Sequence, residues 1–366
     1  MTMPSKIRVG LIGVGNWAEY GHLPALKLLP DYELTAVHSR DLGKAAELAQ
    51  RHGIRFALDS MEALVNHPEV DLVVVLNTAP QHEITVRAAI AAGKDVYCEW
   101  PLTPSKAVSQ ELMELAEQAG VRHIVGLQRR LHPDYRYVRD LLKDGYIGEL
   151  RSVRLHISVE YFQRERIAAL HFTIPPENFS SLLSIYGGHY FDAVFSMLGH
   201  PHSISALTVN QFPEVTLIET GEVLKHTTAD QIVLNGTFSN GAVLTAHIEA
   251  GKRNNYGIQL DLTGTQGDIR ISNTTAFGSG FYTLEAAQGD AQPLQRLKVP
   301  PRYNWLSENN LDNSQQEIAN LYAAYAQDVR DGTHQAPTFA DALCMHELIE
   351  AIETSNREGV RLTLEA

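Results

Sequence analysis

Apolar runs alternate with helix-like stretches along the first third of the chain. The runs include "IRVGLIG", "ELTAVHS", "VDLVVVLN" and "DVYCE", and helical patterns at 17–29, 44–52, 82–92 and 105–119 lie between or after them. The run at 70–77 is nearly all apolar, which is typical of a parallel strand buried on both faces. These spacings predict a doubly wound parallel sheet, so an α/β domain is expected over residues 1–127.

The pattern changes after Gln128. One helix-like stretch at 135–144 is followed by long strand-like segments such as "LRSVRLHISVEYF", "ISALTVNQF" and "QIVLNGTFSNGAVLTAHIEAG", with no helical pattern inside them. The Asn-Gly dipeptide at 240–241 is typical of a hairpin turn. Residues 128–366 are therefore expected to form an α+β domain with an antiparallel sheet.

Two helices are predicted near the end of the chain. Ser314 and Glu317 have the spacing of a capping box at the start of the first one. Its apolar face would consist of Ile318, Leu321, Tyr325 and Val329. A last helix at 340–355 precedes the terminal strand-like "VRLTL".

Composition and charge exclude several classes of protein. The chain has 366 residues, 44% of them hydrophobic and 20% charged, which suits two globular domains. The net charge of -13 argues against binding nucleic acid through a basic face, and Arg129–Arg130 is a rare tight basic pair. No apolar run is long enough for a membrane span or a signal sequence. The two cysteines suit neither a disulfide framework nor a metal site, so a cytoplasmic location without a metal is expected.

The turn after the first apolar run has the chemistry of a phosphate-binding loop. It contains Gly13-x-Gly15-x-x-Ala18, with Val14, Asn16 and Trp17 at the other positions. Gly13 permits the tight turn, Gly15 lets the backbone approach a pyrophosphate, and Ala18 keeps helix and strand close. The helix N-terminus then offers free N–H groups to the phosphate. The same glycines could form an ordinary tight turn, but their place at the first strand–helix junction favours a dinucleotide.

The end of the second strand bears on the choice of cofactor. NAD-binding proteins usually carry an acidic residue there for the ribose hydroxyls. Here Ser39 and Arg40 occupy that point, and Asp41 follows. A hydroxyl and a guanidinium can hold a 2′-phosphate that a carboxylate would repel, so NADP is favoured over NAD. The alternative is that Arg40 is an ordinary surface charge and Asp41 binds the ribose.

Taken together, these segments and three later motifs resemble the Gfo/Idh/MocA oxidoreductase family. The motifs are "CEWPL", "SIYGGHYFD" and the C-terminal "PTFADALCMHELIEAIETSNREGVRLTL". The resemblance covers essentially the whole chain and is nearest to the branch that includes the fungal galactose-regulon repressor. It implies a Rossmann domain, a C-terminal domain with an open, mainly antiparallel sheet, and a last helix that packs back on the Rossmann domain.

The resemblance also implies which residues lie near the cofactor. Asn77, Thr78 and His82 match the loop after the fourth strand, and Gln128 matches a residue beside the nicotinamide ribose. The segment Glu99–Trp100–Pro101 stands where the family has Glu-Lys-Pro. Glu99 is expected to orient this loop. Trp100 could stack beside the nicotinamide or a sugar, or could simply fill the core.

The chain departs from the family at two reactive positions. Trp100 replaces the lysine whose cation would polarise the reacting hydroxyl, and Ile185 replaces an aspartate. His189 and Asp192 of the family constellation remain. His189 has an ordinary pKa near neutrality, suited to general acid–base catalysis, but it could also be structural.

Tyrosine side chains flank His189. Tyr186 and Tyr190 could donate a proton if a cation or the cofactor ribose lowered the pKa of the phenol, or they could simply pack in the core. Tyr161, Gln163 and Arg164 could lie on the substrate side or in a solvated loop.

Two functions remain open at this stage. The first is an NADP-dependent oxidoreductase that acts on a sugar or polyol through an atypical proton donor. The second is a catalytically silent sensor or regulatory protein loaded with NADP. A homo-oligomer formed through the C-terminal sheet is expected in either case, because an open sheet face favours self-association.

Overall fold

The computed structural model describes residues 6–254, 257–275 and 280–364. Contacts between residues divide the chain into two compact units. The first unit contains residues 1–128 and 305–344, and the second contains residues 129–304 and 345–366. The stretch 305–344, which the sequence pattern placed in the second domain, thus groups with the first unit.

The first unit is built on a six-stranded sheet in which all paired strands are parallel. The strand order is β3-β2-β1-β4-β5-β6. The bounds are β1 Ile7–Ile12, β2 Tyr32–His38, β3 Phe56–Leu58, β4 Leu72–Val75, β5 Asp95–Cys98 and β6 His123–Val125. β4 is completely buried, as its apolar sequence predicts. The doubly wound Rossmann fold expected from the sequence is confirmed.

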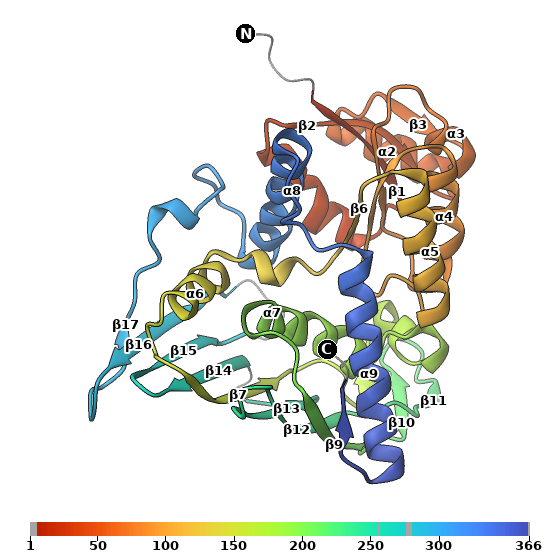
Figure 1. Cartoon of the computed structure of the whole chain (residues 1–366). Helices are drawn as coiled ribbons and strands as arrows, with labels where there is room; N and C mark the ends of the chain where they lie inside the picture. The colour runs from red at the N-terminus through yellow and green to blue at the C-terminus, as the bar shows by residue number, and fades with distance from the viewer. Residues whose placement is uncertain (1–5, 255–256, 276–279, 365–366) are drawn as a thin grey trace. The chain divides into compact units, whose positions relative to one another are not determined.

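Helices cover this sheet on both faces (Figure 1). The bounds are η1 Ala18–His22, α1 Leu23–Leu28, α2 Leu42–His52, α3 Met61–Val65, α4 Ala79–Ala91, α5 Lys106–Ala119 and α8 Asn313–Asp331. η1 is a turn of π-helix that runs directly into α1. Helices α4 and α5 pack together, and α8 packs on η1 and α1 although it lies far away in the sequence. α8 therefore completes the first unit.

The start of α8 differs from the expected capping box. Asp312 is the N-cap, its carboxylate accepts from the backbone N–H of Gln315, and the Gln315 side chain accepts from the backbone N–H of Asp312. The prediction that Ser314 and Glu317 form the box was wrong, because both are buried inside the helix. Asp-x-x-Gln satisfies the same backbone groups as Ser-x-x-Glu and lies two residues earlier. Of the predicted apolar face, Val329 is exposed.

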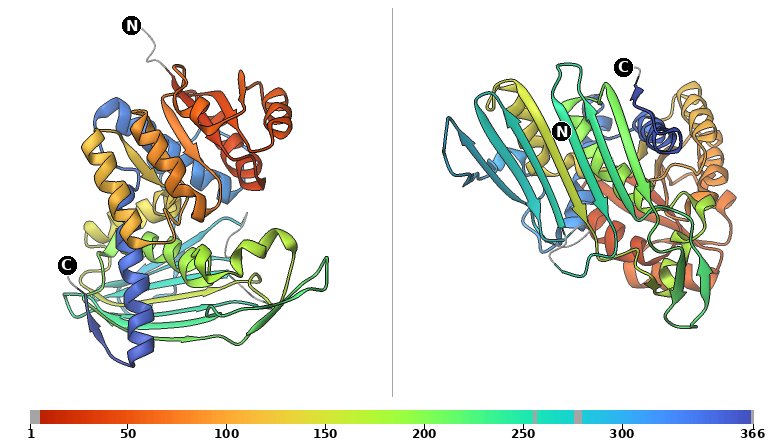
Figure 2. Two further views of the ribbon diagram at one scale, coloured as in Figure 1. Left: turned by 90° about the vertical axis from the view of Figure 1, so that its right-hand side faces the viewer. Right: turned by 90° about the horizontal axis from the view of Figure 1, so that it is seen from below.

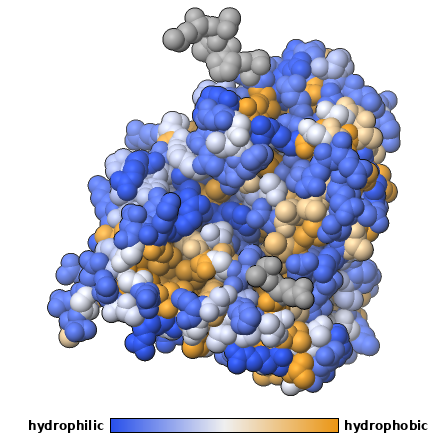
Figure 3. All heavy atoms as spheres, viewed as in Figure 1, coloured by the Kyte–Doolittle hydropathy of each residue, from blue (hydrophilic) through white to orange (hydrophobic). Residues whose placement is uncertain are grey.

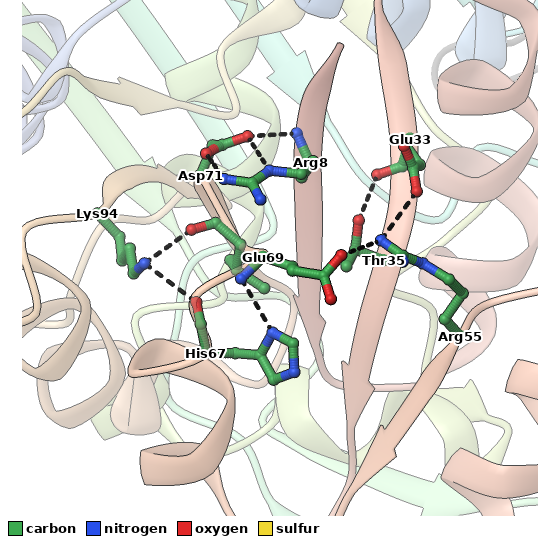
Figure 4. Close-up of polar contacts among 9 residues, drawn as sticks. Arg8, Glu33, Thr35, Arg55, His67, Glu69, Asp71 and Lys94 are labelled. Carbon is green, nitrogen blue, oxygen red and sulfur yellow. Dashed lines mark hydrogen bonds and ion pairs between the residues drawn. The ribbon is translucent and has the colours of Figure 1, made fainter. Parts of the chain in front are cut away.

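Ion pairs and hydrogen bonds join the strands of the first unit at their amino ends (Figure 4). The Arg8 guanidinium donates Nε to Asp71 at 2.9 Å and NH2 to the other oxygen at 2.6 Å. Lys94 donates to the carbonyl oxygens of His67 and Val70. These residues lie opposite the carboxyl ends of the strands, where ligands bind in such sheets. They are partly exposed and have a structural role.

The second unit is built on a nine-stranded sheet of order β17-β16-β15-β14-β7-β13-β12-β9-β18. β13 and β7 are parallel, and the other neighbours are antiparallel. The bounds are β7 Leu150–Ser158, β9 Ser203–Val209, β12 Gln231–Thr237, β13 Val243–Glu249, β14 Gly257–Gly264, β15 Gly267–Asn273, β16 Thr283–Gln288, β17 Gln295–Arg296 and β18 Leu362–Thr363. The expected hairpin joins β12 to β13, and Gly241 in its turn has φ +83°. The open, mainly antiparallel sheet is confirmed.

Two longer helices lie against one face of this sheet, α6 Pro133–Lys143 and α7 Gly188–Leu198 (Figure 2). A π-helical turn, η5 Leu183–Gly187, leads directly into α7. The short helices are η2 Gln128–Leu131, η3 Ala168–Thr173, η4 Pro176–Asn178 and η6 Pro301–Tyr303. A small sheet pairs β11 Val223–Lys225, β10 Glu214–Leu217 and β8 Glu165–Arg166. Among the described residues of this unit, no helix lies on the other face of the large sheet (Figure 2, right).

The last helix, α9 Phe339–Glu358, begins in the first unit and ends in the second. Near its C-terminus, Ser355 Oγ accepts from the backbone N–H of Ala206 at 2.9 Å, and Asn356 Oδ1 accepts from Thr208 at 2.8 Å. Both donors belong to β9, so α9 covers the part of this strand that the short β18 leaves unpaired.

The surface seen in Figure 3 is mainly hydrophilic, with smaller hydrophobic areas. Within the described ranges, none of the helices combines the length and apolar character that a membrane crossing requires.

Candidate functional site

The strand order of the first unit creates a topological switch point. From β1 the chain winds toward β2 and β3 on one side, and toward β4, β5 and β6 on the other. Ligands of such sheets bind at the carboxyl ends of the two central strands. Here these ends carry Gly13, directly after β1, and Asn77, two residues after β4. The sequence-predicted glycine loop therefore lies at the switch point.

Gly13 and Gly15 are glycines for different reasons. Gly13 has φ +109°, and a Cβ there would lie 2.9 Å from the carbonyl group of Leu76. At Gly15 a Cβ would meet no described atom within 4 Å, so the requirement for glycine does not come from the fold. The carbonyl oxygen of Gly15 accepts the first helical hydrogen bonds, from Ala18 and Glu19. Open space next to a helix N-terminus suits a pyrophosphate.

The other residues of the glycine loop differ in exposure. Asn16 is exposed, and Val14 is partly exposed. Trp17 is partly exposed, and its ring centroid lies 6.0 Å from that of His22. Trp17 therefore packs on the helix, whereas Asn16 remains available to a ligand.

At the end of β2, Asp41 has a structural task. It is the N-cap of α2, and its Oδ1 accepts from the backbone N–H of Lys44 at 3.2 Å. Ser39 Oγ accepts from the backbone N–H of Asp41. Arg40 is exposed, and no ion pair joins it to another residue in the part of the chain that the structure describes. The guanidinium is thus available to an anion, and one Asp41 oxygen is occupied by the cap.

His82 ties two predicted cofactor loops together. It is buried in α4, with Nε2 2.8 Å from the Asn77 carbonyl oxygen and Nδ1 2.9 Å from the Pro101 carbonyl oxygen. Burial lowers the pKa of His82, so the ring is neutral and one N–H donates to one of these carbonyls. Thr78, the N-cap of α4, is exposed. The role of His82 in this structure is to hold the loops.

Glu99 belongs to a buried network that the sequence analysis did not identify. Its Oε1 lies 3.0 Å from His22 Nε2 and 2.5 Å from the Tyr97 hydroxyl, which donates to it. The other ring nitrogen of His22 lies 2.7 Å from the Tyr322 hydroxyl in α8. The sequence expectation that Glu99 orients the loop rather than transferring protons agrees with these contacts. No local pattern indicates them, because the partners are up to 300 residues apart in the chain.

Trp100 follows Glu99 and is 5% exposed. The Trp100–Pro101 peptide bond is cis. This burial fits the interpretation of Trp100 as a core residue, and stacking on a nicotinamide stays a prediction.

Three buried acceptors in the first unit have no hydrogen-bond partner among the described residues. They are Asn77 Oδ1, Gln128 Oε1 and, at the start of α8, Asn313 Oδ1. The amide of Asn77 uses its nitrogen to donate to Thr85 Oγ1 at 3.0 Å, so its oxygen is left. Buried polar atoms normally have partners, and Asn77 and Gln128 are predicted cofactor contacts. With the open space at Gly15, the acceptors of these two residues fit a dinucleotide that carries ribose hydroxyls.

The second unit contains a cluster of reactive side chains, which we call the Tyr186 cluster. It consists of Arg129, Tyr186, His189 and Tyr190, each at most 5% exposed. The Cζ atom of Arg129 lies 4.5 Å from the ring centroid of Tyr190. Tyr186, His189 and Tyr190 come from the continuous helical segment η5–α7, at spacings of three and four residues. Such spacings place side chains on one side of a helix.

An ion pair fixes this cluster. Arg130 donates from Nε to Asp192 Oδ2 at 2.9 Å and from NH2 to Oδ1. The Asp192 side chain is fully buried. The bidentate geometry attaches the segment η2 to α7 and makes Asp192 a positioning group. The sequence showed Arg129–Arg130 only as a basic pair, and no local pattern indicated that it is paired with Asp192.

Burial changes the acid–base properties of the cluster. Desolvation, assisted by the positive charge of Arg129, lowers the pKa of His189 well below its ordinary value. The folded environment thus shifts this pKa away from the ordinary value of a histidine, in the direction that favours the neutral imidazole. Desolvation raises the pKa of Tyr186 well above the usual range, and Arg129 opposes this. A protonated phenol is thus present at neutral pH.

A strained residue packs against Tyr186. Phe162 has φ 59°, in the left-handed region, and its ring lies 5.8 Å from the Tyr186 ring in an edge-on arrangement. The Phe162 ring also contacts a buried cation, because the guanidinium carbon of Arg166 lies 5.2 Å from its centroid. Ile185 is partly buried beside Tyr186 in the chain, Tyr161 and Arg164 are exposed, and Gln163 is partly exposed.

Comparison with known proteins agrees with this geometry. The model of the oxidoreductase family with an NAD-binding Rossmann fold matches residues 7–127, and that of the Gal80p C-terminal domain matches residues 133–273. The N-terminal part of the chain thus matches the Gfo/Idh/MocA oxidoreductase family, and the C-terminal part matches the Gal80 branch. The resemblance stated from the sequence is confirmed, and so is an NAD-binding Rossmann domain of the oxidoreductase type.

The proteins that are similar to this chain have different functions. Dehydrogenase aclE of Aspergillus oryzae is 32% identical over 61% of this chain and 63% of that protein, less than two thirds of its length. The galactose/lactose metabolism regulatory protein GAL80 of Saccharomyces cerevisiae is 25% identical over 99% of this chain and 96% of that protein. A structure of levoglucosan dehydrogenase with NADH and levoglucosan has a TM-score of 0.87 at 18% identity, with 99% of this chain and 100% of that chain covered. This last likeness shows the fold.

Proposed function

We propose that this protein is an NADP-dependent oxidoreductase that acts on a sugar or polyol. The observation that carries the proposal is the cofactor half of the site. It combines open space at Gly15 and the buried acceptor of Asn77, which follow β1 and β4, with the buried acceptor of Gln128, which follows β6. Without a ligand these two buried oxygens accept no hydrogen bond, and the hydroxyl groups of a dinucleotide would supply the missing donors.

The choice of NADP rests on the end of β2. Arg40 is exposed, and Asp41 is engaged at the start of α2. A guanidinium forms bidentate, charge-assisted hydrogen bonds with a phosphate. An exposed arginine and an engaged aspartate therefore favour a ribose that carries a 2′-phosphate over a ribose with free hydroxyls.

The substrate class rests on the relatives. Levoglucosan dehydrogenase and inositol 2-dehydrogenase are named for a sugar derivative and a polyol. In the proposed reaction the bound nicotinamide cofactor exchanges a hydride with a carbon that carries a hydroxyl or a carbonyl group. The protein supplies the proton transfer, for which Tyr186 and the neutral His189 are candidates, and Asp192 holds their helix through Arg130.

The test is turnover by the purified full-length protein. A panel of aldoses, ketoses and polyols is assayed in both directions with NADP(H) and NAD(H), and cofactor binding is measured by calorimetry. Turnover with NADP(H) and at least one substrate, lost in Tyr186→Phe or His189→Gln, supports the proposal. NADP(H) binding without any turnover would refute the enzymatic part.

A second candidate function is a cofactor-loaded sensor without catalysis. Trp100, with its neutral indole, replaces the family lysine and is buried, and the similarity to the regulatory protein GAL80 extends over 99% of this chain. Under this alternative, NADP(H) binds tightly, turnover is absent, and a sugar alters the affinity for the cofactor. Calorimetry with and without the sugar panel separates the two functions.

We also propose that two copies associate through the exposed face of the nine-stranded sheet. Positive and negative side chains alternate on this face. The Asp261 carboxylate accepts hydrogen bonds from the guanidinium groups of Arg154 and Arg270. A hollow of about 460 Å³ lies over it, lined by residues that include Asn235 and Thr245. Mixed charges of this kind complement a second copy of themselves around a two-fold axis. Sedimentation equilibrium should show a dimer that the exposed-site change Asn235→Arg dissociates, and a wild-type monomer at high concentration would refute it.

A further inference from the structure

The family's usual cation is missing from this chain, yet the second unit contains a buried cation beside the candidate proton donors. Arg129 is 2% exposed, and its guanidinium is stacked 4.5 Å from the ring centroid of Tyr190. Tyr190 follows His189 directly and lies four residues after Tyr186. Arg129 thus contacts the Tyr190 ring, and its charge also acts on Tyr186 and His189 of the same continuous helical segment.

The position of Arg129 is fixed by its neighbours in the chain. Gln128 precedes it, with a buried amide oxygen that is open to a ligand. Arg130 follows it and is locked to Asp192 of α7 by the bidentate ion pair. The backbone of Arg129 is thus held against the helix that carries Tyr186 and His189. A guanidinium held in this way keeps its charge at any physiological pH.

The groups around Tyr186 shift the pKa of its phenol in opposite directions. Arg129 lowers the pKa of the Tyr186 phenol, whereas Tyr190, Glu160 and Tyr161 raise it together with desolvation, which is the largest effect. Charges act over longer distances inside a protein than in water, because the effective dielectric constant is lower. Arg129 is therefore the group that favours loss of the proton from Tyr186.

We propose that Arg129 supplies the reaction's positive charge, in the role that the missing lysine has in the family, and that it acts through Tyr186 as the proton donor. This inference rests on the proposed oxidoreductase function. In carbonyl reduction, the substrate carbon gains a hydride from the reduced nicotinamide cofactor, which would thereby be oxidised, and its C=O bond becomes a C–O single bond. The oxygen takes the proton from the Tyr186 O–H bond, and solvent restores that proton. Arg129 stabilises the phenolate and alkoxide charge that develops in between.

His189 has a different part in this scheme. A second positive charge on the imidazole would be repelled by Arg129 and disfavoured by burial, so the ring stays neutral. As a neutral group it can donate one hydrogen bond to the substrate oxygen, or accept one from a substrate hydroxyl. The proton that reaches the product therefore comes from Tyr186.

The experiment compares three substitutions at Arg129 in the full-length protein. Arg129→Met removes the charge at similar length, Arg129→Gln is a second uncharged variant in case the first does not fold, and Arg129→Lys keeps the charge. For NADPH-dependent reduction of the best carbonyl substrate of the panel, the uncharged variants should lose on the order of 10²-fold in kcat. The alkaline limb of their kcat/KM profile should move to higher pH, and Arg129→Lys should restore both.

A second measurement does not depend on turnover. The ring signals of His189, assigned with His189→Gln, are followed by NMR during acid titration. Without the Arg129 charge the pKa of His189 should rise, whereas Arg296→Met, which removes an exposed arginine of β17, should leave it unchanged.

The two measurements separate two kinds of failure. Absence of turnover in the wild-type protein overturns the proposed function, and the NMR titration still tests the charge of Arg129. An unmoved His189 pKa in folded, uncharged variants overturns the inference. It is also overturned if turnover occurs and Arg129→Met retains the wild-type pH profile.

Discussion

Arg40 and Asp41 are neighbours in the chain, and the structure gives them different tasks. The Asp41 carboxylate caps α2, whereas the Arg40 side chain is exposed without an ion pair in the described part of the chain. The sequence left open which of the two meets the cofactor ribose. The cap makes the carboxylate a structural group, because it satisfies a backbone N–H at the helix start.

We predict that Arg40→Ala removes most of the preference for NADP(H) over NAD(H). The lost charge-assisted phosphate contact corresponds to about 1–3 kcal/mol in NADP(H) binding, measured by calorimetry. Asp41→Asn is the matched control, because asparagine is also a good N-cap. If Asp41→Asn instead weakened NADH binding and Arg40→Ala changed nothing, Asp41 would be the ribose ligand.

Gly15 allows a sharper prediction. A Cβ at this position meets no described atom within 4 Å, so Gly15→Val should leave the thermal unfolding transition unchanged. The valine would occupy the pyrophosphate space, and NADP(H) binding should fall below detection. Gly13→Ala should show the opposite pattern, with a lower Tm, because Gly13 has φ +109° and little space. Undiminished NADP(H) binding by Gly15→Val would disprove the assignment of the loop.

At the scale of elements, contacts between loops matter more than the loops' own sequences. His82 lies between the loop after β4 and the loop after β5, with a ring nitrogen close to a backbone carbonyl oxygen of each and its single N–H donated to one of them. Glu99 links the second of these loops to α8 through His22 and Tyr322. Both cofactor loops are therefore held by side chains that are buried in helices.

We predict a pH dependence of stability from His82. Burial lowers its pKa in the folded state, whereas the unfolded chain titrates near pH 6.5. Its contribution to stability is therefore complete above about pH 6.5 and declines as the pH falls toward the folded pKa, because the unfolded chain binds the extra proton. Each such proton contributes up to about 1.4 kcal/mol per pH unit.

Urea unfolding of the wild type and His82→Gln at pH 7.5 and 5.5 measures this effect. The variant should be less stable than the wild type at pH 7.5, through its lost hydrogen bonds, and the difference should shrink at pH 5.5. A difference that is equal at both pH values would contradict the assignment of His82 as a buried neutral group.

At the scale of the whole molecule, the sequence matches the residues expected for the cofactor half of the family's site more completely than those expected for the reactive half. The glycine loop and the amides of Asn77 and Gln128 are in place in the first unit. Trp100 and Ile185 replace the family's lysine and aspartate, and the second unit retains His189 and Asp192.

We predict that Trp100→Lys combined with Ile185→Asp increases turnover of family sugar substrates. Each restored catalytic group typically contributes 10²–10⁴-fold, so even imperfect placement should be measurable. Trp100→Leu with Ile185→Asp is the control, because it removes the indole without adding a cation, and it should gain less. Both proteins must retain NADP(H) binding. Robust wild-type turnover that Trp100→Lys reduces would mean that the tryptophan belongs to a working active site.

The sequence alone determined the parts of this protein that depend on local pattern. Strand–helix alternation predicted the parallel sheet, Asn240–Gly241 predicted the hairpin, and the glycine spacing predicted a tight turn after the first strand, which lies at the switch point. These features follow from a residue's own backbone preferences and from the periodicity of its near neighbours. The capping box shows the limit of such patterns, because Asp312–Gln315 and Ser314–Glu317 fit the rule equally well.

The tertiary structure decided what depends on partners distant in the chain. An amphipathic pattern shows that α8 has a buried face but does not name the surface that covers it, and the structure places it on η1 and α1. Likewise, the sequence contains Arg129 and His189 as separate residues. Only folding buries them beside each other, and burial together with the neighbouring charge makes the histidine neutral. A pKa depends on solvent exposure and on nearby charges, and both arise only in the folded chain.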